Sequence, residues 1–303
     1  MKQFWALNKR NIKLYFKDHS AVFFSLLSML IVIMLMVFFL GNMANASILN
    51  AVKDIPGRDL AADILRVKEM VYLWTVAGII TINAASVTHS FYTNMIKDRG
   101  DNKLNSILVM PIKRSHITAS FVFGAWFVSV IMGCLTLLVT QIIGVFRGFE
   151  VLSFVTILKV LLIISLNALV YASIMFFFAS IVKSESAWGA IGIIIGTLSG
   201  FLGGIYLSVG DLSEGVVKVL KCFPFIYGTS ALREVMLDAT EDVFFEGTPE
   251  VIRESVDAAI GNSLSLFEKE LLGGQKMGIL LLVGLVFMFL STLIITFSKK
   301  KDR

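Results

Sequence analysis

The chain has 303 residues, of which 56% are hydrophobic and 16% are charged, and its mean hydropathy is +0.82. A soluble domain carries roughly 45–50% apolar and about 25% charged residues, so both values exclude an ordinary soluble protein. The apolar residues form runs too long for a soluble core, which predicts an integral membrane protein. Four prolines and little apolar–polar alternation favour helices over a barrel. The two cysteines, Cys134 and Cys222, give no disulfide framework and no metal-ligand spacing.

Six segments are long and apolar enough to be transmembrane helices in a window of about 19 residues. They are Ala21–Leu40, Tyr72–Ser90, Ile117–Val145, Leu152–Val182, Ala187–Leu207 and Met277–Phe297. The third and fourth exceed the ~20 residues that a bilayer requires, so we expect them to tilt or to extend beyond it. The first is too long for the ~7–15-residue core of a signal peptide, and Gly41–Ala44 after it is a poor cleavage site.

The charged residues divide unequally between the two sides of the predicted membrane. One side holds 15 Lys/Arg and 5 Asp/Glu, in Met1–His19, Phe91–His116, Lys183–Ser186 and Ser298–Arg303. The other side holds 12 Lys/Arg and 17 Asp/Glu. The positive-inside rule therefore places the basic side, and with it both termini, in the cytoplasm. The net charge of +5 follows from this topology, and no basic domain indicates a nucleic-acid partner.

Residues Met1–Lys17 have the pattern of an amphipathic helix at the membrane surface. On a helix at ~100° per residue, the five basic side chains fall within an arc of roughly 100°, and aromatic and aliphatic residues occupy the rest. This segregation predicts an interfacial helix over residues 1–20, with its lysines facing anionic lipid and the cytoplasm. A plain basic flank is the alternative, but it does not explain the angular segregation.

The segment between the second and third predicted spans, Lys97–Ser115, combines an apolar stripe with basic ends. Asp101 and Asn102 can cap a short helix, and Pro111 ends it. Such a helix, held away from the bilayer, suits docking into a groove on a cytoplasmic partner, and an ordinary connecting loop is the alternative. The candidate docking residues are Arg99, Leu104, Asn105, Ile107, Leu108, Pro111, Lys113 and Arg114.

This segment resembles the coupling loop of ABC-2 type transporter permeases, in which a proline ends the coupling helix and a basic pair follows, as Pro111, Lys113 and Arg114 do here. An amphipathic elbow helix, six spans and a proline-centred extracellular segment follow the family's order along nearly the whole chain. The resemblance implies a cytoplasmic P-loop ATPase subunit as partner. Two positions depart from the family pattern, because Asn102 stands where many members have Gly and Asn105 where many have Glu.

The stretch Gly210–Gly274 holds twelve acids and is predicted to form an extracellular subdomain over about residues 208–276. Its first part is apolar but interrupted at Pro224 and Gly228, so neither half is long enough to cross the bilayer. A paired re-entrant helix is predicted there, and a surface amphipathic helix is the alternative. The resemblance implies that it caps the outer end of the translocation path. The candidate gate residues are Pro224, Tyr227 and Arg233.

Two further patterns lie near this stretch. Later in the stretch a helix is predicted to end at about Ile260, because Pro249 suits the first turn of a helix and Gly261 suits the position after its last turn. Before it, the fifth span carries glycines at four-residue intervals, which predict a groove for close helix packing. These glycines are Gly192, Gly196, Gly200 and Gly204. The pattern leaves open whether the groove contacts a second subunit or gate, or packs within one subunit.

Several kinds of chemistry are absent from the sequence. It contains no Gly-x-x-x-x-Gly-Lys-Ser/Thr loop, so the chain is not itself the ATPase, and ATP is expected on a partner subunit. It contains no His-Glu-x-x-His, and its three histidines are far apart. The spans hold almost no acids, which disfavours a membrane enzyme and an ion-coupled carrier. We therefore expect no catalytic residue, no cofactor and no metal site.

Together these features predict an all-α integral membrane protein, with an elbow helix over 1–20 and one six-span domain over 21–303. The predicted function is the permease subunit of an ABC exporter in the cytoplasmic membrane, paired with a second permease copy or a paralogue. Its substrate is expected to be hydrophobic or amphipathic, such as a drug, an antimicrobial peptide or a lipid-linked molecule. The alternatives are a non-transporting immunity or sensor subunit on the same scaffold, and a secondary carrier.

Overall fold

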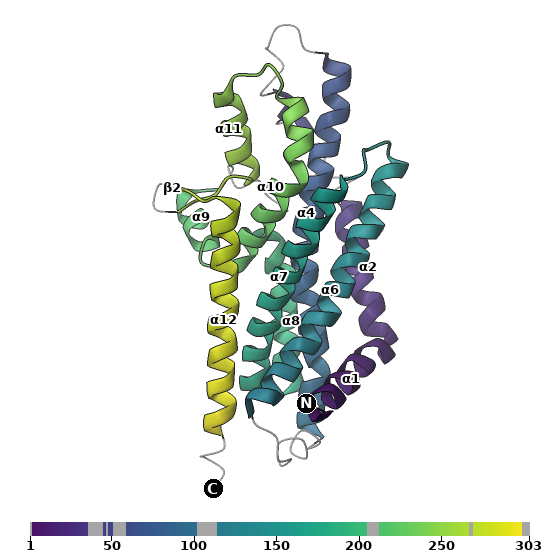
Figure 1. Ribbon diagram of the computed structural model, residues 1–303, viewed down its shortest axis with the longest axis vertical. Helices are drawn as coiled ribbons and strands as arrows, with labels where there is room; N and C mark the ends of the chain where they lie inside the picture. The colour runs from purple at the N-terminus through teal and green to yellow at the C-terminus, as the bar shows by residue number, and fades with distance from the viewer. Residues whose placement is uncertain are drawn as a thin grey trace.

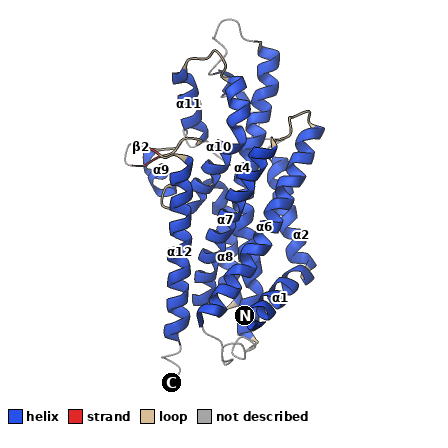
Figure 2. Ribbon diagram, viewed as in Figure 1, coloured by secondary structure: helices blue, strands red, loops and turns tan. Residues whose placement is uncertain are grey.

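The structure is a computed structural model that describes residues 2–35, 45–46, 48–50, 59–101, 114–204, 212–266 and 269–298. Over these residues it is an elongated bundle of long helices, with both chain ends at one end of the bundle (Figure 1). We call this the termini end, and the other the opposite end. The strands of the described part form one short antiparallel hairpin, β1 (Ser265–Leu266) and β2 (Lys269–Glu270) (Figure 2). The predicted all-α class of integral membrane protein is confirmed.

Five helices in the described part of the chain are long and apolar enough to cross a membrane. They are α4 (Leu60–Gly100), α6 (Arg114–Phe146), α7 (Phe154–Ile181), α8 (Glu185–Leu202) and α12 (Gly273–Ser298). Their positions match five of the six predicted spans. The remaining predicted span, Ala21–Leu40, overlaps α2 (His19–Leu35), a helix of 17 residues. The last five residues of that predicted span lie outside the described residues.

Helix α4 is the central element of the bundle and extends beyond the predicted second span at both ends. Its 41 residues make it about 60 Å long, twice the ~30 Å hydrocarbon core of a bilayer. Asp59 caps its start by accepting a hydrogen bond from Ala61 N at 2.9 Å. The first turns bury Asp63, Val67 and Met70 on one face, but their charged neighbours lower the hydropathy of this part. A hydropathy window therefore detects only the middle of the helix.

The core consists of two main clusters of buried side chains, one in each half of the bundle. The cluster nearer the termini end includes Tyr15 of α1 (Lys2–Lys17), together with Phe91 and Tyr92 of α4. The cluster nearer the opposite end includes Trp74 of α4 and Phe149. Helices α4 and α7 contribute to both clusters, whereas α8 and α12 leave most of their surface exposed. The exposed faces of α8 and α12 carry large apolar side chains, as expected of helices that face lipid.

Between α8 and α12 the described residues, 212–266 and 269–270, include two short helices and one longer one. The helices α9 (Glu214–Leu220) and α10 (Pro224–Phe244) meet at a bend of 91°. Proline is favourable at the start of α10 because the first turn of a helix does not use its N–H groups. The next helix, α11 (Glu250–Ile260), ends where the sequence predicts. Gly261 follows it with φ +74°, a left-handed conformation that favours glycine.

Candidate functional site

The segment predicted to dock an ATPase lies mostly outside the described residues. The predicted docking residues in that position are Leu104, Asn105, Ile107, Leu108, Pro111 and Lys113. Arg114 is the first residue of α6, and its side chain is not described. Arg99 lies in the last turn of α4, where Nη1 donates to the carbonyl oxygen of Ala179 at 2.9 Å and to that of Val182. The Arg99 side chain therefore contacts the C-terminal end of α7 within the same chain.

Helix α1, which the sequence predicts to be an interfacial elbow helix, lies across the termini end beside α6 (Figure 1). Its side chains Asn8, Asn11 and Tyr15 are buried, while Lys9 and Lys13 are exposed. Arg10 of α1 forms an ion pair with Asp98 of α4, with 2.5 Å between Nη2 and Oδ2. The helix thus buries a face of mixed polarity against the bundle and turns its lysines outward.

The start of α8 packs against α4 through a histidine and a tryptophan. The rings of His89 and Trp188 are stacked with their centroids 4.4 Å apart. His89 Nε2 lies 3.1 Å from the carbonyl oxygen of Trp188, and Trp188 Nε1 donates to Thr93 Oγ1 at 3.1 Å. Both rings thus have polar partners at the contact, so α8 is fixed to α4 near the termini end.

The four glycines predicted to form a groove on α8 have different surroundings. A Cβ at Gly192 would lie 2.6 Å from the His89 ring, so only glycine permits the close approach of α8 to α4 there. A Cβ at Gly196 would meet no atom within 4 Å, and this residue is exposed. Gly200 is buried, and Gly204 has φ +62° in the turn after the helix. Gly192 thus packs within the chain, whereas the exposed Gly196 leaves room for a contact with another subunit.

The predicted re-entrant segment coincides with the bend between α9 and α10. Tyr227, one turn into α10, donates from Oη to the carbonyl oxygen of Lys221 in the bend at 2.7 Å. Phe225 packs its ring against that of Tyr171 of α7, with 4.9 Å between centroids. Gly228 permits a close contact with α7, because a Cβ there would lie 2.3 Å from Asn167 Oδ1. The N-terminal part of α10 is thus packed deep in the protein.

Arg233 is fully buried in the middle of α10. Its guanidinium donates to the carbonyl oxygens of Gly204 at 2.8 Å and of Ile260 at 3.0 Å, just after α8 and at the last residue of α11. It also lies over the Trp74 ring, with 4.2 Å from Cζ to the centroid. None of the carboxylates in the described part of the chain pairs with it. The negative ends of the helix dipoles and the indole face stabilise the cation instead.

Next to Arg233, a second buried cation joins α12 to α10. Lys276 Nζ forms an ion pair with Glu234 Oε2 at 2.8 Å and donates to the carbonyl oxygen of Asn262 at 2.9 Å. The same carbonyl accepts from Ser230 Oγ at 2.7 Å. The Asn262 backbone, which follows α11, is therefore shared by residues of α10 and α12. This network holds α10, α11 and α12 together at the opposite end.

The Asn262 side chain contacts two carboxylates of the predicted extracellular subdomain. Its Nδ2 donates to Glu241 Oε1, in the last turns of α10, and to Asp257 Oδ1 of α11 at 3.3 Å. Burial, and then the neighbouring Asp257 carboxylate, raise the pKa of Glu241 to about 8, although the Arg253 cation acts in the other direction. Burial likewise raises the pKa of Asp257. This pair of acids therefore holds protons more tightly than exposed carboxylates do.

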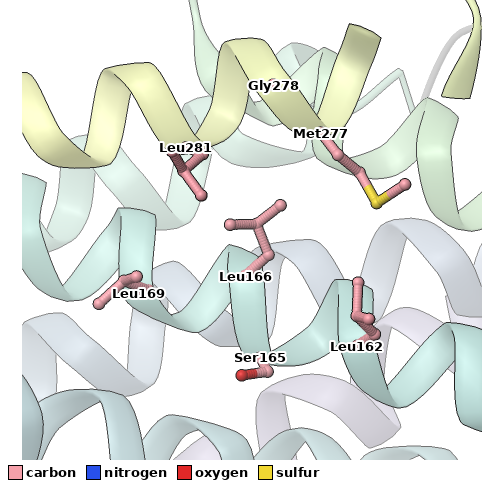
Figure 3. A pocket seen from close by; sticks show the side chains of 7 residues that line it. All are labelled: Leu162, Ser165, Leu166, Leu169, Met277, Gly278 and Leu281. Atoms are coloured by element: carbon pink, nitrogen blue, oxygen red, sulfur yellow. The ribbon is translucent and has the colours of Figure 1, made fainter. Parts of the chain in front are cut away.

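A groove of about 420 Å³ opens between α7 and α12. It is lined by Leu162, Ser165, Leu166, Leu169, Met277, Gly278 and Leu281. Leu166 projects from α7 toward α12 (Figure 3), and Leu162 and Leu281 are exposed. The hydroxyl of Ser165 already accepts from Trp126 Nε1 at 3.3 Å. The groove therefore presents a mainly apolar surface to the membrane, with the Ser165 hydroxyl as the one polar side chain among these lining residues.

The fold and these contacts define a multi-pass helical membrane protein. Among the described residues, no group of three or more His, Cys, Asp or Glu side chains could hold a metal ion. The model of the ABC-2 family transporter protein family matches residues 50–293, so the chain belongs to this family. Membership in this family supports the assignment of the chain as an ABC transporter permease, a membrane transport component, and implies an ATPase partner. No curated protein matches the chain.

The sequence alone did not identify several of the residues that make these contacts. Asp98 and His89 were missed because their partners are Arg10 and Trp188, which lie about ninety residues away in sequence. Lys276 carried no decisive signal, because a lysine at the start of an apolar span can extend its ammonium group to the membrane interface without a protein partner. Its carboxylate partner could not be selected from the twelve acids that precede it.

Proposed function

We propose that the chain is the permease subunit of an ATP-driven ABC exporter that works with a separate ATPase subunit. The family match over residues 50–293 carries this proposal. The sequence supports it, because it contains no P-loop with which the chain could bind ATP by itself. The charge distribution supports an arrangement in the cytoplasmic membrane with the termini end facing the cytoplasm, since that end carries the excess of lysine and arginine.

The ATPase docks on the coupling helix between α4 and α6. The apolar side chains Leu104, Ile107 and Leu108 form the face that enters the groove of the ATPase. The other proposed docking residues belong to the same segment, at Asn105, Pro111, Lys113 and Arg114. Arg99, which the sequence also suggested for docking, is not proposed to bind the ATPase, because its guanidinium donates within the chain to Ala179 and Val182. When ATP closes the ATPase pair, the coupling helix moves, and the long helix α4 carries this movement toward the opposite end. The bundle then changes between inward- and outward-accessible states.

The bend between α9 and α10 forms the outer gate, with Pro224, Tyr227 and Arg233 as its principal residues. Its 91° angle, its deep packing against α7 and the buried position of Arg233 support this role. Polar groups buried in a membrane protein are commonly functional, which adds to the support.

A second copy of the chain, or a paralogue, completes the path. The exposed faces of α8 and α12 support this arrangement, because they offer surface for another subunit. Gly196 lies on the exposed part of α8, where a small residue permits close approach of a helix from another chain. The substrate is hydrophobic or amphipathic, such as a drug, an antimicrobial peptide or a lipid-linked molecule. The nearly acid-free spans and the apolar groove between α7 and α12 support this choice.

The proposal is tested by co-expressing the chain with candidate P-loop ATPase subunits from the same organism and measuring co-purification. Replacing Leu104, Ile107 and Leu108 together by Asp should abolish co-purification. Ser106→Asp, on the other side of the predicted helix, is the matched control and should leave it intact. In vesicles reconstituted with both proteins, extrusion of a lipophilic cationic dye should require ATP and stop with vanadate. Co-purification of the triple variant would refute the docking surface, and vanadate-insensitive extrusion would indicate a secondary carrier.

A further inference from the structure

The last turn of α4 contacts two other elements just before the chain enters the proposed coupling helix. Asp98 forms an ion pair with Arg10 of α1, with 2.5 Å between Oδ2 and Nη2. The next residue, Arg99, points to α7, where its guanidinium donates to Ala179 and Val182. Two adjacent side chains thus connect the end of α4 to two different neighbours. A displacement of this turn must displace those neighbours or break the contacts.

The acceptors of Arg99 are the free carbonyl oxygens at the C-terminal end of α7. The last carbonyls of a helix have no partner within the helix and carry partial negative charge. An arginine satisfies them well, because one guanidinium nitrogen has two N–H groups and can donate to two carbonyls. Lysine also carries the charge, but its ammonium lacks the planar arrangement of donors. Arg99 therefore caps α7 from a neighbouring helix.

The contact at Arg99 extends directly to α8. Only residues 182–184 separate α7 from α8, and Ser184 caps α8 by accepting from Ala187 N at 3.3 Å. A Cβ at Gly100 would lie 3.8 Å from Glu185 Oε1, so the end of α4 lies beside the first turn of α8. Nearer the middle of the bundle, His89 of α4 stacks on Trp188. The end of α4 and the turn between α7 and α8 are thus joined at two levels.

We propose that Arg99 is the positioning residue that transmits movement of the coupling helix to α7 and α8. This inference rests on the proposed function, and it gives Arg99 a role distinct from binding the ATPase. The Arg99 guanidinium is already bound within the chain, so its removal should leave the docking face in place. Loss of the contact should separate ATP binding at the ATPase from movement of α8. Coupling carried by packed elements of this kind is commonly worth about 5–150-fold in an equilibrium.

The experiment follows α8 directly in the complex of the full chain with the ATPase. Cys134 and Cys222 are replaced by alanine, and Ile193→Cys, at an exposed position of α8, carries a spin label. The change in label mobility on adding ATP and vanadate is the readout, and co-purification is measured in parallel. Lys97→Ala is the matched control, because Lys97 lies in the same turn as Arg99 but is exposed.

We expect Arg99→Ala to co-purify with the ATPase as the wild type does, and to lose at least about fivefold of the label response. Lys97→Ala should keep the full response. If Arg99→Ala does not fold, Arg99→Lys serves in its place, with a smaller loss expected because lysine keeps the charge. A full response in the folded Arg99 variant, or an equal loss in Lys97→Ala, would overturn the inference alone. Failure of the unmodified chain to bind the ATPase would overturn the proposed function, and with it this inference.

Discussion

Arg99 and Arg233 use the same chemistry at the two ends of the bundle. Each donates to backbone carbonyls at or just beyond the C-terminal end of another helix, α7 for Arg99 and both α8 and α11 for Arg233. Neither forms an ion pair with a carboxylate in the described part of the chain. Helix ends can therefore accommodate a cation inside a membrane protein, because their carbonyls supply both hydrogen-bond acceptors and partial negative charge.

The two sites differ in burial and in the number of elements that they join. Arg233 is fully enclosed and stacked on Trp74, and it holds four helices at one point. Arg99 is only partly buried and joins α4 to the end of α7, next to the proposed coupling helix. A completely buried cation is costly to displace, whereas a partly buried one can exchange its partners for water. We infer that the Arg233 site holds α10 in place within the proposed outer gate, and that the smaller Arg99 site moves together with α7 during a transport cycle.

The strongest way to test this difference is to remove Arg233. Arg233→Ala would remove the donor to the buried carbonyl oxygen of Gly204 and leave a cavity beside Trp74, so we expect a loss of stability on the order of 3 kcal/mol. Thermal unfolding of the detergent-solubilised protein measures it. Arg253→Ala is the matched control, because Arg253 pairs with the exposed Asp242 and should cost under about 1 kcal/mol. Equal melting temperatures for the two variants would contradict the structural role of Arg233.

A second test compares two glycines on α8. Gly192→Ala places a Cβ 2.6 Å from the His89 ring, so we expect the α4–α8 contact to weaken by about 1–3 kcal/mol. Gly196→Ala meets no atom within 4 Å and should leave the isolated chain as stable or slightly more stable, because alanine favours helix. Thermal unfolding compares both. If Gly196→Ala lowers stability as much as Gly192→Ala, the assignment of the two glycines to different surfaces is wrong.

The opposite end should also respond to pH through Glu241. Its pKa of about 8 in the folded protein lies above the ~4.3 of an unfolded chain, so the folded state holds the proton more tightly. The stabilising contribution is therefore complete at low pH and is lost as the pH rises through 8. We expect the protein to lose about 2–3 kcal/mol of stability between about pH 6 and about pH 9.

Glu241→Gln provides the control for this pH dependence, since glutamine has nearly the same shape and does not titrate. Thermal unfolding of both proteins across the pH range should give a slope for the wild type and a weaker slope for Glu241→Gln. The remaining slope is assigned to Asp257, whose pKa is also raised by burial. The same slope in both proteins would show that Glu241 is not the titrating group.

The parts of the fold and of the candidate site that the sequence predicts are those that depend on the type of a residue. Spans follow from apolar runs, and the end of α11 follows from Gly261, so both could be predicted. The partners of Arg99 and Arg233 could not be predicted, because their acceptors are backbone carbonyls, which every residue has. The glycine spacing on α8 predicted close packing, but only the structure shows that Gly192 meets His89 and Gly196 meets nothing. The extent of α4 was missed because charged residues interrupt its apolar pattern.

The smallest expected effect concerns the ion pair between Arg10 and Asp98 beside Arg99. Both side chains are partly accessible to water, at 38% and 13% exposure, so the pair should contribute under about 1 kcal/mol. A double-mutant cycle with Arg10→Ala and Asp98→Asn measures this coupling free energy by thermal unfolding. A coupling free energy of about 3 kcal/mol or more, as for a fully buried pair, would contradict the weak contribution that we expect from a pair accessible to water. A small value would leave α1 free to separate from α4 while Arg99 keeps α4 joined to α7.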